Sequence, residues 1–332
     1  MSDSLHSTRT HSAPGPAVMP QINWLGETMD STRPVILVGS SLEVGSDPVV
    51  RTALDLSRQL EGRLIFFHAH SLPVAFFAGP SGMTTISPGL LEAERNLRER
   101  MVDVQLKRLG ASRSDLEEVV VQAGAPHRSL LEATTESQVD LIVLGANEHP
   151  ERFWQGSTAD RVLRKATCPV WIVHGRGGGL PRRILAPTDL SALSEESLVR
   201  GLSLVASLGV EGDPIDLLTL FVLTQEERGS STQFDGDQIE RLAKEELDRF
   251  TGRFQDQEGF HVSGGVRVGN VRQEILAELE DTEADLMIMG THGRSGFERF
   301  LLGSVAADLA GRSPQDVLIV PPGEAMEGGD ET

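Results

Sequence analysis

The sequence of 332 residues has almost no cysteine and no long apolar run. Cys168 is the one cysteine, so no disulfide can form within the chain, which agrees with a reducing, cytoplasmic location. No stretch approaches the roughly 18 consecutive apolar residues that a membrane-spanning helix needs, so we expect no membrane partner. Residues 1–32 contain neither an apolar core nor a basic start, unlike a secretory signal. We expect flexible tails at 1–32 and 323–332.

Positive charge is scarce in the second half of the chain, and the formal net charge is −19 at pH 7. Residues 33–175 hold 15 basic and 17 acidic residues, whereas residues 176–332 hold 14 basic and 29 acidic residues. Nucleic acids are bound by Lys and Arg surfaces that neutralise phosphates, so this composition argues against a nucleic-acid partner. A phosphate ligand of the second half would have to be held by local donors.

Two catalytic signatures are also missing from the sequence. No Gly-x-Gly-x-x-Gly turn follows the first predicted strand of either half, which argues against a dinucleotide-dependent dehydrogenase. The nine histidines are scattered, and His68 and His70 have no carboxylate nearby in the sequence. This spacing argues against a metal-dependent hydrolase, because such sites need several converging ligands.

One pattern occurs twice along the chain. Residues 139–145 and 284–290 are apolar runs that each end in glycine, 145 residues apart. Further on, Gly156 and Gly303 each precede a serine, 147 residues apart, and the first strands of the two patterns lie 148 apart. The sequence therefore contains two copies of one supersecondary plan.

Each copy alternates short, nearly continuous apolar runs with longer amphipathic stretches. Such runs are typical of parallel strands covered by helices on both faces. We therefore predict an α/β fold of two doubly wound α/β sandwich domains, each with a five-stranded, mostly parallel sheet. In the second copy the pattern predicts strands near 183–187, 215–222, 261–268, 285–290 and 316–320, and helices near 192–208, 237–256, 270–281 and 303–312.

The glycine-rich stretch 175–181 separates the two copies. It is short, so we expect the two domains to pack against each other rather than to move freely. The predicted domain boundaries are 33–175 for the first copy and 181–322 for the second.

The clearest chemical signal lies between residues 290 and 304. The stretch contains three glycines, Gly290, Gly293 and Gly303, and Ser304 directly follows the last of them. A predicted strand leads into the stretch, and a predicted helix begins at its end. Glycine lets backbone amides approach a phosphate chain closely. The first amides of the helix are unpaired and lie at the positive end of its dipole, and the Ser304 hydroxyl adds a donor. The stretch therefore predicts a phosphate-binding loop, in which Arg294 or Arg299 could offset charge.

The first strand of the second copy delivers Pro187, Thr188 and Asp189 to the carboxyl edge of the sheet, where ligands of doubly wound folds bind. Asp189 is placed there to accept hydrogen bonds from a ribose or an adenine. It is almost equally well placed to cap the helix that begins near Ser191. The sequence leaves both roles open.

These residues are where the chain resembles the universal stress protein family. The resemblance covers both copies, about residues 33–322, and is strongest from Asp285 to Ser304. It implies that the second copy binds an adenine nucleotide, and we expect one ATP per chain with Mg²⁺ or Mn²⁺ held by the phosphates. The resemblance implies that the phosphate or ribose is contacted by Gly290, Gly293, Gly303, Ser304 and Val305. It implies that the adenine and ribose side is formed by Pro187, Thr188, Asp189 and Val222. Met289 should lie beside the base.

Members of this family also tend to dimerise through their last strand. In a tandem chain the strands near 169–173 and 316–320 can satisfy that pairing internally, and a homodimer is also compatible with the resemblance. The first copy departs from the family pattern, because Glu148 replaces the second glycine of the loop and Ser41 stands where Asp189 has its counterpart. A carboxylate at that turn opposes a triphosphate, so we expect little or no ATP there.

The sequence favours nucleotide binding in a regulatory or stress-response role without catalysis. Phosphoryl transfer normally needs a base and a metal-binding carboxylate, and no Walker lysine follows the loop. A slow ATPase or phosphotransferase that uses Glu298 is one alternative. A purely structural dimerisation module without nucleotide is the other.

Overall fold

The computed structural model describes residues 33–70, 88–146, 156–175, 179–209, 213–229, 235–291 and 302–323. The predicted tail at 1–32 lies outside these residues. The strands of the first copy are β1 (Val35–Gly39), β2 (Arg63–His70), β3 (Glu118–Ala123), β4 (Leu141–Gly145) and β5 (Val170–Val173). Those of the second copy are β6 (Arg183–Thr188), β7 (Ile215–Leu223), β8 (Phe260–Val268), β9 (Leu286–Gly290) and β10 (Asp316–Val320).

The helices alternate with these strands. Those of the first copy are α1 (Asp47–Gln59), α2 (Pro88–Arg108), α3 (Pro126–Glu136) and α4 (Thr158–Leu163), with short 3₁₀ turns η1 (Val44–Ser46) and η3 (Arg113–Asp115). Those of the second copy are α5 (Ala192–Ser207), α6 (Gln225–Gly229), α7 (Gly236–Thr251), α8 (Val271–Asp281) and α9 (Ser304–Arg312). No helix in the part of the chain that the structure describes has the length and apolar character needed to cross a membrane.

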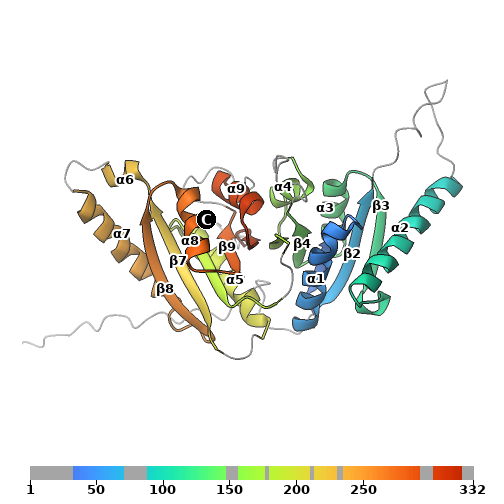
Figure 1. The fold of residues 1–332 in the computed structure, drawn as a ribbon, viewed down its shortest axis with the longest axis horizontal. Helices are drawn as coiled ribbons and strands as arrows, with labels where there is room; N and C mark the ends of the chain where they lie inside the picture. Colours follow the sequence, from blue (N-terminus) through green and yellow to red (C-terminus); the bar gives the residue numbers. More distant parts are fainter. Residues whose placement is uncertain are drawn as a thin grey trace, which may run out of the picture.

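The strands form one continuous ten-stranded sheet in the order β3-β2-β1-β4-β5-β10-β9-β6-β7-β8, with helices on both faces (Figure 1). Within each copy all neighbouring strands are parallel. The copies meet at β5 and β10, which pair antiparallel with Leu318 opposite Trp171. The α/β fold class is confirmed, and the two five-stranded sheets join into one.

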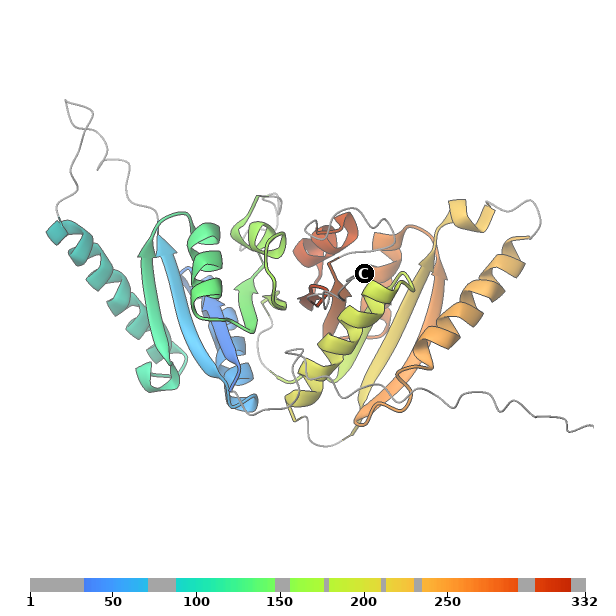
Figure 2. The same ribbon diagram turned by 180° about the vertical axis from the view of Figure 1, so that it is seen from behind.

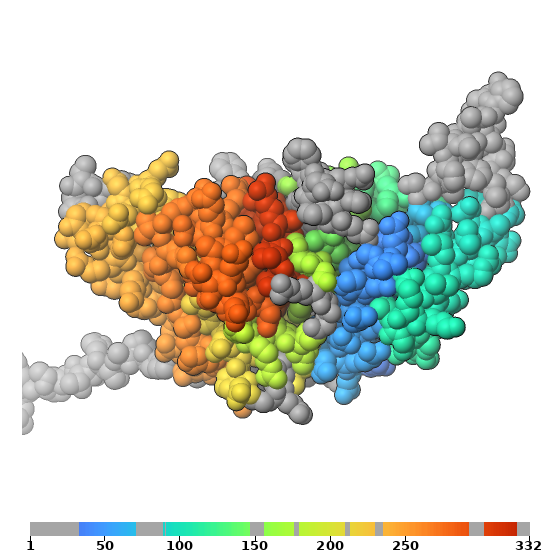
Figure 3. Space-filling model, in the orientation of Figure 1, coloured from blue at the N-terminus to red at the C-terminus, as the bar shows by residue number. Residues whose placement is uncertain are grey.

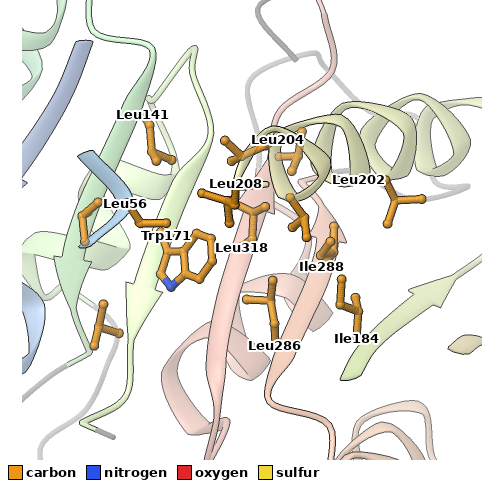
Figure 4. Packing of buried hydrophobic residues seen from close by; sticks show 14 of the residues in the cluster. Leu56, Leu141, Trp171, Ile184, Leu202, Leu204, Leu208, Leu286, Ile288 and Leu318 are labelled. Carbon is orange, nitrogen blue, oxygen red and sulfur yellow. The ribbon is translucent and has the colours of Figure 1, made fainter. Parts of the chain in front are cut away.

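Buried apolar side chains form one layer on each face of the sheet, and each layer runs through both copies. One layer lies under α1, α2, α5 and α7, and the other lies under α3, α4, α8 and α9. Seen from behind, α5 lies across the strands of the second copy near the junction (Figure 2). At the junction itself, Leu56 and Trp171 of the first copy pack in the same cluster as Leu318 and Ile288 of the second (Figure 4). Full burial of such side chains stabilises the fold by about 1.5–3 kcal/mol each, so the junction is part of the core.

The predicted elements of the second copy lie within one or two residues of the observed ones, with two exceptions. The helix expected at 237–256 ends at Thr251, where Gly252 follows, because glycine is a poor helix former. The short helix α6 was not predicted. Its first turn is stabilised by Thr224 and Glu227, whose side chains each accept a hydrogen bond from the other residue's amide. This Thr-x-x-Glu spacing is a sequence signal for a helix start.

Candidate functional site

The turn after β6 is organised by its own side chains. Thr188 Oγ1 accepts a hydrogen bond from the Leu190 amide at 2.9 Å, and Leu190 adopts a left-handed backbone with φ of 63°. Asp189 Oδ1 accepts hydrogen bonds from the amide and the hydroxyl of Ser191, at 3.0 and 2.6 Å. Ser191 is the N-cap of α5, since its hydroxyl accepts from the Ser194 amide at 3.2 Å. Asp189 therefore supports the capping residue and does not itself cap the helix.

The ends of β6 and β9 lie side by side at the carboxyl edge of the sheet. The two strands pair in parallel, with Ile184 opposite Leu286 and Leu185 opposite Met287. At this edge β6 ends at Thr188 and β9 ends at Gly290. Pro187 and Asp189 flank Thr188, so the structure gathers this predicted group at one edge.

Two predicted apolar residues lie on the α8 and α9 face of the sheet. Val222 of β7 and Met289 of β9 are both buried, and they belong to one apolar cluster. Leu302 and Ala306, from the segment that leads into α9, belong to the same cluster. Val222 and Met289 therefore belong to the apolar layer that lies under α8 and α9.

The start of α9 leaves backbone donors without partners inside the helix. Gly303 is the N-cap residue, and its amide donates to the carbonyl of Thr291 at 2.7 Å. A side-chain Cβ at position 303 would lie only 3.2 Å from that carbonyl oxygen, which explains the glycine. The Ala307 amide is the first to bond within the helix, at 2.9 Å to Gly303, so the amides of residues 304–306 have no intrahelical partner. These donors point out of the helix end and suit an anion.

Ser304 and Arg272 add to the donors at this helix start. No contact within the described part of the chain uses the Ser304 hydroxyl, and no side chain caps α9. A guanidinium NH₂ group of Arg272 in α8 donates to the Ser304 carbonyl at 3.4 Å, and its Nε lies 3.5 Å from Asp308 Oδ2. Sequence reasoning missed Arg272, which belongs to the helix predicted at 270–281.

The first copy repeats the turn but has a carboxylate at its helix start. Ser40 Oγ accepts from the Leu42 amide at 3.0 Å, and Leu42 has a φ of 67°, as in the second copy. At the start of α4, however, the Gly156 amide donates to the carboxylate of Asp160 at 2.8 Å. Ser157 Oγ accepts from the Asp160 amide at 3.1 Å.

Asp160 is 2% exposed, and its carboxylate also pairs with Arg164, whose Nε lies 3.0 Å away. The equivalent position in the second copy is Ala307, which cannot fill this role. The Asp160 carboxylate therefore places a negative charge at the start of α4, whereas the equivalent position in α9 carries none.

A cavity of about 1320 Å³ lies at the carboxyl edge of the first copy. Gly39, Ser40 and Asp160 line it from the first copy, and Ser304 and Asp308 of α9 line it from the second. Helix α9 is thus a wall shared by both copies, and the space-filling view shows it against the first copy at the centre of the molecule (Figure 3).

Two aspartates of the repeated motif hold the start of the first strand in each copy. Asp140 Oδ2 accepts from the Val35 amide at 2.7 Å, and the Asp285 carboxylate accepts from the amides of Arg182 and Arg183. Burial raises the pKa of Asp285, and these backbone hydrogen bonds oppose that change. Asp140 and Asp285 therefore have a structural role at the amino edge of the sheet, away from the candidate site.

The comparison with protein families decides which family the chain belongs to. The model described as "Universal stress protein family" matches residues 33–174 and again residues 181–321. The chain belongs to the universal stress protein family. It is similar to a universal stress protein of Mycolicibacterium smegmatis, with 27% identity over 302 residues, which are 86% of this chain and 97% of that protein.

A solved universal stress protein shows the same fold. The crystal structure of one from Archaeoglobus fulgidus aligns with a TM-score of 0.56 at 19% identity, covering 87% of this chain and 98% of that one. A universal stress protein solved in complex with cAMP is 25% identical and covers 44% of this chain and 99% of that one, at a TM-score of 0.29.

The structure of this universal stress protein brings most of the predicted site residues to one end of the second copy. Gly293, Arg294, Glu298 and Arg299 lie outside the described residues, as does Glu148 of the first copy. Among the residues that are described, no group of three or more His, Cys, Asp or Glu could hold a metal ion. The residues gathered near the carboxyl edge are Pro187, Thr188, Asp189, Val222, Met289, Gly290, Gly303, Ser304 and Val305.

Proposed function

We propose that this universal stress protein binds one adenine nucleotide, ATP, in its second copy and acts as a regulator rather than as an enzyme. The observation that carries the proposal is the start of α9. There the amides of residues 304–306 have no intrahelical partner, and no described contact uses the Ser304 hydroxyl. Such a helix start beside the carboxyl edge of a doubly wound sheet favours a phosphate group.

The proposal assigns each predicted residue a place around the nucleotide. Gly290, Gly303, Ser304 and Val305, with Gly293, would surround the phosphates, and Arg294 would offset their charge. Pro187, Thr188, Asp189 and Val222 would form the adenine and ribose side, with Met289 beside the base. Mg²⁺ or Mn²⁺ would be held by the phosphates themselves.

Asp189 would contact the ribose while it supports the helix cap. Its Oδ1 accepts two hydrogen bonds from Ser191. Those bonds also fix the orientation of the carboxylate before a ligand arrives. A preorganised acceptor of this kind loses little entropy when it binds a ribose hydroxyl.

We also propose that the chain forms two domains, 33–175 and 181–322, that act together in the cytoplasm. The antiparallel pairing of β5 with β10 supports this arrangement, because it uses strands near the end of both copies. A family tendency to dimerise through the last strand would then be met within one chain. The first copy would bind little ATP, since the Asp160 carboxylate accepts from the Gly156 amide at the start of α4 and would repel a phosphate there.

Isothermal titration of the full chain with Mg-ATP tests the proposal, and we expect one ATP per chain. Gly293→Asp should abolish binding, because a carboxylate in the loop repels the phosphates. Ser304→Ala should weaken binding several-fold through the loss of one hydrogen bond. The matched variant Ser157→Ala should leave the affinity unchanged.

A stoichiometry near two would contradict the assignment of the first copy. Normal binding by Gly293→Asp would contradict the assignment of the loop. Release of phosphate from ATP at a steady rate, lost in Glu298→Gln, would support the ATPase alternative.

A further inference from the structure

The carbonyl of Ala310 near the end of α9 has no donor within its own helix. In an α-helix the carbonyl of residue i accepts from the amide of residue i+4. For Ala310 that residue is Pro314, which has no N–H. The first copy supplies the missing donor, because His174 Nε2 lies 3.0 Å from the Ala310 carbonyl oxygen. A carbonyl can only accept, so Nε2 carries the proton.

His174 is itself fixed across the junction of the two copies. Its backbone amide donates to Asp316 Oδ1 at 3.0 Å, and the indole Nε1 of Trp171 donates to Asp316 Oδ2 at 2.9 Å. Both oxygens of one carboxylate in the second copy therefore hold residues of the first copy. Burial lowers the pKa of His174 to about 4, so its imidazole is neutral at pH 7.

In the described part of the chain, these contacts occur on one side of the junction. At the offset of 147 residues, His174 corresponds to Pro321 and Asp316 corresponds to Pro169. Neither proline has the side-chain donor or acceptor of its counterpart. Pro314 corresponds to Thr167, so the first copy does not lose the equivalent helix donor. Among the residues that the structure describes, the junction therefore supports α9 and makes no equivalent contact to α4.

Helix α9 is held at its two ends by different copies. Its first turn is held within the second copy, by Thr291 through Gly303 and by Arg272 through the Ser304 carbonyl. Its last turn is held by His174 of the first copy. Nine helical residues span about 14 Å, and a helix moves as a stiff rod, so a shift at one end changes the direction of the other.

We propose that His174 is a positioning residue for the nucleotide site of the second copy. By holding the Ala310 carbonyl it fixes the axis of α9, and with it the direction of the amides at Ser304 and Val305. The first copy thereby sets the affinity of a site to which it contributes no phosphate contact. This inference rests on the proposed function, since it concerns the same site.

Two substitutions of His174 separate its hydrogen bond from its bulk. The amide nitrogen of Gln reaches the position of imidazole Nε2, whereas that of Asn reaches only the position of Nδ1. His174→Gln should keep the dissociation constant for Mg-ATP within about twofold of the wild type. His174→Asn should raise it about three- to tenfold, the range of one hydrogen bond. Isothermal titration of the full chain measures both.

Trp171→Phe is the matched control for simple weakening of the junction. It removes the indole donor to Asp316 but leaves the contact between His174 and Ala310, so it should lower the melting temperature and leave the affinity unchanged. Equal affinities in all variants, or a loss in Trp171→Phe as large as in His174→Asn, would overturn the inference while the proposed function stands. A wild-type chain that binds no ATP would overturn both.

Discussion

His174 also links the stability of the junction to pH. Its pKa falls from 6.5 to about 4 because burial disfavours the charged imidazole, and the hydrogen bond with the Ala310 carbonyl partly opposes this. The unfolded chain therefore takes up a proton at a higher pH than the folded chain does. The contribution of His174 to stability is fully present above pH 6.5 and is lost as the pH falls toward 4. A shift of this size corresponds to about 3 kcal/mol.

Urea unfolding of the wild type and of His174→Gln between pH 7 and pH 4.5 tests this linkage. Burial raises the pKa of Asp316, so its contribution has the opposite sign and decreases as the pH rises through its folded pKa. Asp316 is present in both proteins, and its effect largely cancels in the comparison. We expect the wild type to lose more stability than His174→Gln as the pH falls. Equal pH slopes for the two proteins would contradict the assignment.

At the scale of single residues, the sequence could predict which positions gather at the site but not their hydrogen-bond partners. Pro187, Thr188 and Asp189 were predictable because the carboxyl ends of parallel strands meet at one edge. The role of Asp189 depended on whether Ser191 or Asp189 faced the first amides of α5, which is a matter of backbone geometry. The bond between His174 and Ala310 joins residues 136 positions apart and follows no periodic pattern.

At the scale of elements, the starts of α4 and α9 differ in how they are stabilised. Asp160 is buried and accepts from the Gly156 amide and from Arg164. Asp160→Ala would leave that amide and the guanidinium without an acceptor, at a cost of about 2–3 kcal/mol in the free energy of unfolding. Denaturant unfolding of the full chain measures this loss.

Asp308→Ala is the control for Asp160→Ala. Asp308 is the residue next to the equivalent position in α9, and it forms partly exposed ion pairs with Arg272 and Arg312. Exposed pairs contribute about 0–1 kcal/mol each, so its removal should cost much less. Similar losses in the two variants would show that Asp160 does not stabilise the start of α4 as described.

The positions of strands and helices were predictable because both are set by local patterns. Strands buried on both faces are nearly continuous apolar runs, so β9 and β10 were located within one residue. Helix α6 was missed because it is short and has no buried residue, so no apolar periodicity marks it. Only the spacing of Thr224 and Glu227 indicates it.

At the scale of the whole molecule, the two copies share both apolar layers, so we expect the chain to unfold in one cooperative transition. Leu318 is fully buried and pairs with Trp171 at the centre of the sheet. Leu318→Asp places a carboxylate in this core and should separate the unfolding of the two copies into two calorimetric transitions at lower temperature. Leu97→Asp, on an exposed face of α2, should leave a single transition near that of the wild type. A single transition in Leu318→Asp would show that the copies do not depend on this pairing.

The single-sided contacts around Asp316 have a consequence for how such a chain can change. When two identical chains meet about a twofold axis, every contact across the axis occurs twice, and each substitution is copied on both sides. A single chain that contains both copies is free of this constraint. Asp316 can therefore accept hydrogen bonds from Trp171 and His174, while the equivalent position in the first copy is Pro169. The two copies are therefore no longer equivalent. One can specialise in binding a ligand and the other in supporting the copy that binds it.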